Sequence, residues 1–161
     1  MKKSLLILLL IPLLSGCTAN IVGKFDNYNE IFSGTTDIDV MTGEGTVYVK
    51  STPSNITCEG DRWITYIPMS SYLLGTCKGQ KGKIELSCND GRTIQGDFVC
   101  ESCTSVRGKG NTNLNEGITF YATMSKKKYD KKVDEYKNSM EKGPDIKGNS
   151  FSDGSTLEDL F

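Results

Sequence analysis

The stretch of the chain that decides the fold is residues 83–100, KIELSCNDGRTIQGDFVC. Apolar and polar side chains alternate on both sides of a turn at residues 89–92, and a period of two is typical of a strand with one buried face. Gly91 suits the turn because glycine adopts a positive φ without a Cβ clash. The stretch therefore predicts a β-hairpin, with these residues on one face: Ile84, Leu86, Cys88, Ile94, Gly96, Phe98 and Cys100.

Similar alternation recurs on both sides of the hairpin. Val47 and Val49 alternate with polar neighbours, and residues 118–124 form a final alternating run. Pro, Gly and Asn separate these runs. We expect strands within 28–40, 46–51, 56–58, 62–67, 75–78, 101–116 and 118–124, besides the hairpin. The predicted fold is mainly β: a small antiparallel β sandwich or roll over residues 25–124, with a C-terminal amphipathic helix.

The period changes over residues 125–142. Tyr129, Val133, Tyr136 and Met140 recur at spacings of four, three and four, with charged residues between them. This spacing predicts an amphipathic helix with Ser125 as its N-cap, ending at Gly143-Pro144. Its apolar stripe is narrow, which suits docking on a sheet. The basic run 126–128 at its start opposes the helix dipole and faces either solvent or anionic headgroups.

Residues 143–161 are polar and rich in Gly and Ser, so we expect a flexible acidic tail. Its last seven residues, STLEDLF, fit a single amphipathic turn with a capping box between Ser155 and Glu158. Such a segment suits docking to a protein partner or folding onto its own domain.

The first residues indicate where in the cell the protein is expected. Residues 1–16 contain Lys2 and Lys3, followed by an apolar run that is too short to span a bilayer, as in a cleaved signal peptide. Residues 14–17, Leu-Ser-Gly-Cys, resemble the bacterial lipobox, in which the cysteine is acylated and becomes the first mature residue. An ordinary secretory signal followed by a chance cysteine is the alternative. We expect Cys17 to carry the lipid, palmitate included, and residues 17–24 to be a lipidated tether.

Composition narrows the function. Removing Lys2 and Lys3 leaves 17 basic against 20 acidic residues, a net charge of −3 that gives no basis for binding nucleic acid. The chain has no histidine, which excludes histidine-dependent catalysis and histidine-ligated metals. Thr18 stands where an aspartate would indicate inner-membrane retention, so the outer membrane is the expected location. We expect no metal, no cofactor and no enzymatic activity.

Five cysteines remain after Cys17, and an exported protein uses them first as disulfides. Because five is odd, at most two bridges form within one chain. If Asp90-Gly91 is the centre of the hairpin, Cys100 lies opposite Lys81, and Cys103 lies one residue from the position opposite Cys77. A bridge from Cys77 to Cys103, or to Cys100, follows from this geometry.

Residues 32–123 resemble a family of small, Gly-rich bacterial lipoproteins without an assigned function. The most specific element is Cys88-Asn89-Asp90-Gly91-Arg92, and weaker ones are Phe32-Ser33-Gly34, Gly43-Glu44-Gly45, Cys58-Glu59-Gly60, Gly82, Gly108, Gly110 and Phe120. In such proteins the cysteine of Cys-x-Gly occurs together with the one before Asp-Gly-Arg. The resemblance therefore implies a disulfide between Cys58 and Cys88.

Few other residues suggest chemistry. Cys100 and Cys103 form a CxxC pair, but no helix follows to lower a thiol pKa. Asp37 and Asp39 lack the further oxygens of a calcium loop.

Turn chemistry already explains Asp90 beside Arg92. The aromatic residues Trp63, Tyr66 and Tyr72 suit packing in the core or on the sheet better than a ligand patch.

Three functions fit these observations. The first is a membrane-anchored lipoprotein of the cell envelope that binds a partner without catalysis, through its β face, its C-terminal helix or its tail. The second is a periplasmic thiol–disulfide redox protein using residues 100–103. The third, by analogy of size and anchoring alone, is a phage- or plasmid-encoded exclusion or inhibitor lipoprotein.

Overall fold

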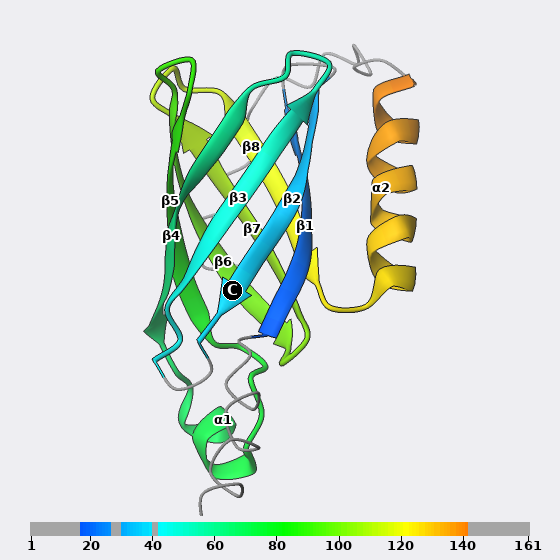
Figure 1. Ribbon diagram of the computed structural model, residues 1–161. Coiled ribbons are helices and arrows are strands. Elements are labelled where there is room, and N and C mark those ends of the chain that lie inside the picture. Colours follow the sequence, from blue (N-terminus) through cyan, green and yellow to red (C-terminus); the bar gives the residue numbers. More distant parts are fainter. Residues whose placement is uncertain (1–16, 27–29, 40–41, 142–161) are drawn as a thin grey trace, which may run out of the picture.

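The chain forms a closed antiparallel barrel of eight strands in sequence order, with a helix against its outer wall (Figure 1). The computed structural model describes residues 17–26, 30–39 and 42–141. Its elements are β1 (Cys17–Phe25), β2 (Ile31–Ile38), β3 (Gly45–Thr52), β4 (Thr57–Tyr66), α1 (Met69–Leu74), β5 (Lys81–Cys88), β6 (Thr93–Ser102), β7 (Ser105–Thr112), β8 (Gly117–Thr123) and α2 (Lys126–Glu141).

The predicted sandwich or roll is corrected to a barrel, while the mainly β, antiparallel character with a C-terminal helix is confirmed. The closing pair is β1 with β8, in which Gly23 lies opposite Phe120 and Lys24 opposite Thr119. This pairing leaves no free sheet edge between the first and last strands.

Residues 17–24, predicted to be a tether, instead belong to the barrel. They form most of β1, which pairs with β2 on one side and β8 on the other. Polar Thr18 and Asn20 made the segment resemble a linker, but the alternating Ala19 and Ile21 are buried in the interior. The β domain thus begins at Cys17 rather than at residue 25.

Two other predicted elements differ from the structure. The expected strands at 56–58 and 62–67 are one strand, β4, because Gly60 permits close approach to β5 without ending the ladder. No strand forms at 75–78. A short helix, α1, precedes this segment and ends at Gly75, which has the left-handed conformation common at helix C-termini.

The central hairpin forms with its register shifted by one residue from the prediction. Ile84 pairs with Gly96, and Lys81 pairs with Val99 rather than with Cys100. The turn has three residues between Cys88 and Arg92, and Gly91 takes the positive φ of 87°. A three-residue turn with a left-handed glycine is common in hairpins, and it moves the centre by half a residue pair.

The barrel interior is filled by side chains. The inward positions of the hairpin are those that alternation predicted, and Val47 and Val49 join them while Tyr48 faces outward. Three phenylalanine rings lie directly over glycines of neighbouring strands: Phe32 over Gly23, Phe98 over Gly82 and Phe120 over Gly108. A Cβ at any of these glycines would overlap the ring, so the three glycines make room for the large core residues.

Helix α2 packs outside the barrel against β1 and β8. Ser125 acts as the predicted N-cap, because its Oγ accepts the backbone N–H of Lys128 at 3.4 Å. Tyr136 is the buried residue of the helix, and Val22 of β1 beneath the helix is fully covered. The predicted helix end at Gly143-Pro144 and the acidic tail lie outside the described residues.

The barrel has two ends with different contents. We call one the Cys17 end: it carries the start of β1, the β2–β3 loop, the connection with α1, the β6–β7 turn and the start of α2 (Figure 1). We call the other the Arg92 end, formed by the β1–β2, β3–β4, β5–β6 and β7–β8 connections.

Candidate functional site

The cysteine of the lipobox-like motif lies at the edge of the barrel. Cys17 is exposed, is the first residue of β1 and pairs with Ile38 of β2. Among the described residues, no helix has the length and apolar character needed to cross a membrane. Because Cys17 is the first residue of β1, any lipid on it would be joined to the sheet without an intervening linker.

Two disulfides join the strands. Cys58 is bonded to Cys88 across β4 and β5, as the family resemblance implies. Cys77 is bonded to Cys103, one of the two partners that the hairpin geometry allowed, and this bridge ties the segment after α1 to the β6–β7 turn. Cys100, the alternative partner, is free and buried.

The two cysteines of the CxxC motif are thus separated in role. Cys103 forms a disulfide with Cys77, whereas Cys100 is free and buried in the barrel. Burial raises the pKa of the Cys100 thiol, against the opposing charge of Arg62. A buried, protonated thiol without a nearby thiol partner is a poor nucleophile and suits structural packing.

Arg62 is an unusual component of the interior. It is 5% exposed, its guanidinium carbon lies 4.8 Å from the centre of the Phe98 ring, and its Nε has no hydrogen-bond partner among the described atoms. Burial lowers the pKa of Arg62, with the neighbouring Cys100 acting in the opposite direction. The contact with Phe98 supplies a cation–π attraction in place of an ion pair.

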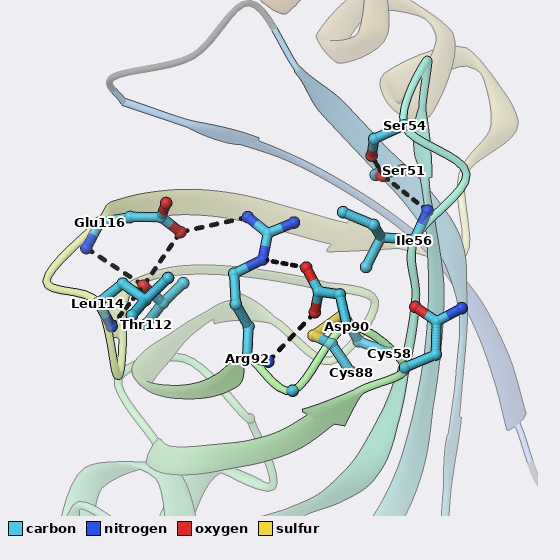
Figure 2. Close-up of polar contacts among 12 residues, drawn as sticks. Ser51, Ser54, Ile56, Cys58, Cys88, Asp90, Arg92, Thr112, Leu114 and Glu116 are labelled. Carbon is cyan, nitrogen blue, oxygen red and sulfur yellow. Dashed lines mark hydrogen bonds and ion pairs between the residues drawn. A yellow bond between two sulfur atoms is a disulfide. The ribbon is translucent and has the colours of Figure 1, made fainter.

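The Arg92 end is closed by a network of polar side chains, which Figure 2 shows with Arg92 between two carboxylates. Arg92 Nε donates to Asp90 Oδ2 at 2.7 Å, and Nη1 donates to Glu116 Oε2 at 3.2 Å. Thr112 Oγ1 donates to the same Glu116 oxygen at 3.1 Å. The guanidinium also lies 4.9 Å from the centre of the Phe25 ring, above the core.

This network is structural in character. Burial opposes the charge on Arg92, but hydrogen bonds and attraction from Asp90 and Glu116 outweigh it and raise the pKa of Arg92. Burial also opposes the charge on Asp90, yet hydrogen bonds from Arg92 lower the Asp90 pKa overall. The groups satisfy one another, so the pair noted in the sequence closes the barrel end.

A groove runs between α2 and the outer wall of the barrel. Its cavity volume is about 760 Å³. The wall contributes outward residues of β6, β7 and β8, and the other side is one face of α2. The charged and tyrosine residues that line it are Asp26, Asp97, Glu101, Arg107, Lys109, Tyr121, Lys128, Lys131, Lys132, Glu135 and Tyr136.

The charges of the groove are only partly paired. Lys132 pairs with Glu135 at 2.7 Å and Arg107 with Glu101 at 3.5 Å. Within the described part of the chain, no ion pair is formed by three further cations, Lys109, Lys128 and Lys131. Lys132 Nζ also lies 5.1 Å from the centre of the Tyr136 ring. Among the described residues, the carboxylates Asp26 and Asp97 of the lining form no ion pair either. Because Tyr136 is buried, the aromatic surface of the groove is that of the half-buried Tyr121, beside three ammonium groups without ion pairs.

The aromatic residues considered in the sequence do not form one cluster in the core. Trp63 is half-buried on β4, whereas Tyr66 and Tyr72 are exposed. The exposed pair belongs to an apolar tip, which we define as Tyr66, Ile67, Met69, Tyr72, Leu73 and Leu74, each between 53% and 79% exposed. The prediction that core or sheet packing covers these aromatics is wrong for Tyr66 and Tyr72.

The groove and the apolar tip were both missed by sequence reasoning. The groove joins residues from β6 to β8 with α2, and only the docking of the helix brings them together. The sequence did contain a local sign of the apolar tip. Residues 72–74 are apolar, stand next to a glycine and lie in a segment without the alternation of a strand.

No protein-family model matches the chain, and no characterised protein matches it in sequence. Among solved structures, a de novo designed fluorescence-activating β-barrel is 14% identical with a TM-score of 0.49, covering 68% of this chain and 93% of its own. A redesigned β-barrel is 13% identical with a TM-score of 0.49, covering 70% of this chain and 92% of its own.

Proposed function

We propose that this chain is a bacterial envelope lipoprotein that is anchored through acylated Cys17 and acts by binding a partner, without catalysis. The observation that carries the anchoring is the motif Leu14-Ser15-Gly16-Cys17 after a charged and apolar leader. The exposure of Cys17 at the edge of the barrel supports it, because an acyl chain there meets no steric obstacle from the core. We place the protein in the outer membrane, since Thr18 does not resemble the retention residue.

Metabolic labelling with palmitate tests the anchoring. The full chain should incorporate label and partition with membranes, and Cys17→Ser should do neither. Cys100→Ser is the matched control, because it removes a cysteine that is buried and should leave labelling unchanged. Equal labelling of the Cys17→Ser variant, or none in the natural chain, would overturn the proposal.

The groove beside α2 is the partner site that we propose. Three ammonium groups without ion pairs, beside the half-buried ring of Tyr121, favour an acidic protein segment with some apolar side chains. The groove has no cluster of nucleophile, base and orienting residue, and burial together with Glu135 and Asp26 raises the pKa of Tyr136, which keeps that phenol protonated. Binding is the use that this arrangement supports.

Site-specific photo-crosslinking tests the groove. A crosslinker at position 131 should capture a partner in envelopes, whereas one at 137, on the same helix but outside the groove, should not. Reversing Lys128 to Glu should abolish the adduct, and Lys127→Glu, which changes charge beside the groove, should preserve it. Adducts that persist in Lys128→Glu would contradict a role for the groove charges.

The redox alternative makes the opposite prediction for thiols. If the protein is a binding protein acylated on Cys17, the acylated form should present no reactive thiol when native and one, Cys100, after unfolding. Two readily titrated thiols at Cys100 and Cys103 would favour the redox function instead.

A further inference from the structure

The exposed apolar tip around α1 needs an explanation, because soluble proteins seldom leave a contiguous apolar patch in water. Tyr72, Leu73 and Leu74 follow one another in α1 and are 79%, 73% and 74% exposed. Tyr66, Ile67 and Met69 adjoin them in the chain and are exposed as well. The tip has the composition of an interfacial membrane segment, with aliphatic residues beside tyrosines.

The tip is held in place rather than left free to collapse on the barrel. The Cys77–Cys103 disulfide fastens the segment after α1 to the β6–β7 turn. Ser71 is the buried residue of α1, and its Oγ donates to the carbonyl of Lys78 at 2.5 Å. The backbone N–H of Gly79 donates to the Cys100 carbonyl at 2.8 Å. This scaffold presents the apolar side chains outward.

The tip and Cys17 lie at the same end of the barrel. In Figure 1, α1 projects beyond the point where β1 begins. Since β1 and β5 face each other across a ring of eight strands, Cys17 and α1 are on opposite sides of that end. Cys17 is itself a strand residue, so an acyl anchor there has no spacer and holds this end of the barrel against the bilayer.

We propose that the apolar tip inserts into the interfacial region of the same bilayer that holds the acyl chains of Cys17, an inference that rests on the proposed anchoring. Two contacts on opposite sides of one end then fix the barrel upright, with the Arg92 end pointing away from the membrane. An interfacial segment of this kind is buried to a depth of about 5–10 Å.

Apolar burial, rather than charge, drives the insertion. The Cys17 end carries acidic Asp37, Asp39 and Glu44 as well as basic Lys78 and the run at 126–128. These opposite charges leave little net attraction to anionic lipid. Insertion should therefore occur in zwitterionic vesicles and change little with salt.

Quenching by brominated lipid tests the insertion. The lipidated full chain is reconstituted into phosphatidylcholine vesicles with or without brominated acyl chains. Trp63→Phe removes the single tryptophan, and the reporter is then Leu73→Trp in the tip or Leu114→Trp at the Arg92 end, whose natural leucines are 73% and 63% exposed. Quenching should be several-fold greater at position 73 than at 114. Equal quenching would overturn the insertion.

Three further measurements separate the causes of a negative result. Mass spectrometry of the same preparation reports whether Cys17 is acylated. If the protein is acylated and the quenching is equal, the proposed insertion is wrong and the proposed anchoring stands. If the protein is not acylated, the proposed anchoring is wrong, and so is the insertion that rests on it. Thermal unfolding confirms the fold of each variant, and Tyr72→Trp provides a second reporter in the tip. If tip fluorescence changes only when envelope proteins are added and brominated lipid has no effect, the tip docks on a protein and the proposal is wrong.

Discussion

The two ends of the barrel differ in the side chains that they expose. At the Arg92 end, Arg92, Asp90 and Glu116 form a network that closes the mouth over Phe25. At the Cys17 end, the tip around α1 exposes leucine and tyrosine side chains, and a disulfide keeps it rigid. The polar groups of the Arg92 end stabilise the fold, whereas the exposed apolar groups of the Cys17 end contribute little to its stability. This difference is the reason for our proposal that the Cys17 end contacts the membrane.

The largest effect should come from breaking the network at the Arg92 end. Arg92→Met leaves Glu116 buried without its cation, which should lower the free energy of unfolding by about 3–5 kcal/mol. Urea denaturation measures it. Arg107→Met, which removes an exposed ion pair with Glu101, is the control and should cost less than about 1 kcal/mol. Equal losses in the two variants would refute a special role for the Arg92 network.

The next effect should come from the disulfide at the Cys17 end. Replacing Cys77 and Cys103 together by alanine removes a cross-link between residues 26 positions apart, worth about 3 kcal/mol. Amide hydrogen exchange should accelerate most in residues 69–80, with residues 89–92 at the other end almost unchanged. Uniform acceleration throughout the barrel would show that the two ends are coupled more tightly than we infer.

A smaller effect should appear in acid. Because the pKa of Asp90 is lower in the folded protein than in the unfolded chain, its contribution to stability is present above the unfolded pKa of about 4 and is lost as pH falls through the folded pKa. Asp90→Asn should lower the free energy of unfolding by up to about 1 kcal/mol at neutral pH and by less at low pH. Unfolding by urea across this pH range measures the difference. If the loss of unfolding free energy in Asp90→Asn stayed constant with pH, the lowered pKa of Asp90 would not be the source of the effect.

The smallest effect on stability should come from the tip. Leu73→Ser with Leu74→Ser exposes no new core, so the free energy of unfolding should change by less than about 0.5 kcal/mol. Leu86→Ala in β5 is the buried counterpart and should cost about 2–5 kcal/mol. A large loss in the serine variant would mean that the tip is part of the fold and not a surface for contact.

Much of the inward face of the barrel was accessible from the sequence. Ile84, Leu86, Ile94 and Phe98 are buried as alternation predicted, because the side-chain direction in a strand depends only on position along it. Helix α2 and its cap at Ser125 likewise follow from neighbouring residues. The exact register did not follow, because the choice of a three-residue turn moves every pair by one position.

What the sequence alone determined was local: which positions alternate, where the hairpin turns, where the helix begins, and which motif precedes Cys17. Only the tertiary structure decided that residues 17–24 are a strand, that β1 meets β8, and that Cys17 and α1 share one end. The physical reason is distance along the chain. The ladder that joins Asn20 to Thr123 depends on the closure of all eight strands, and no local pattern of residues specifies that closure.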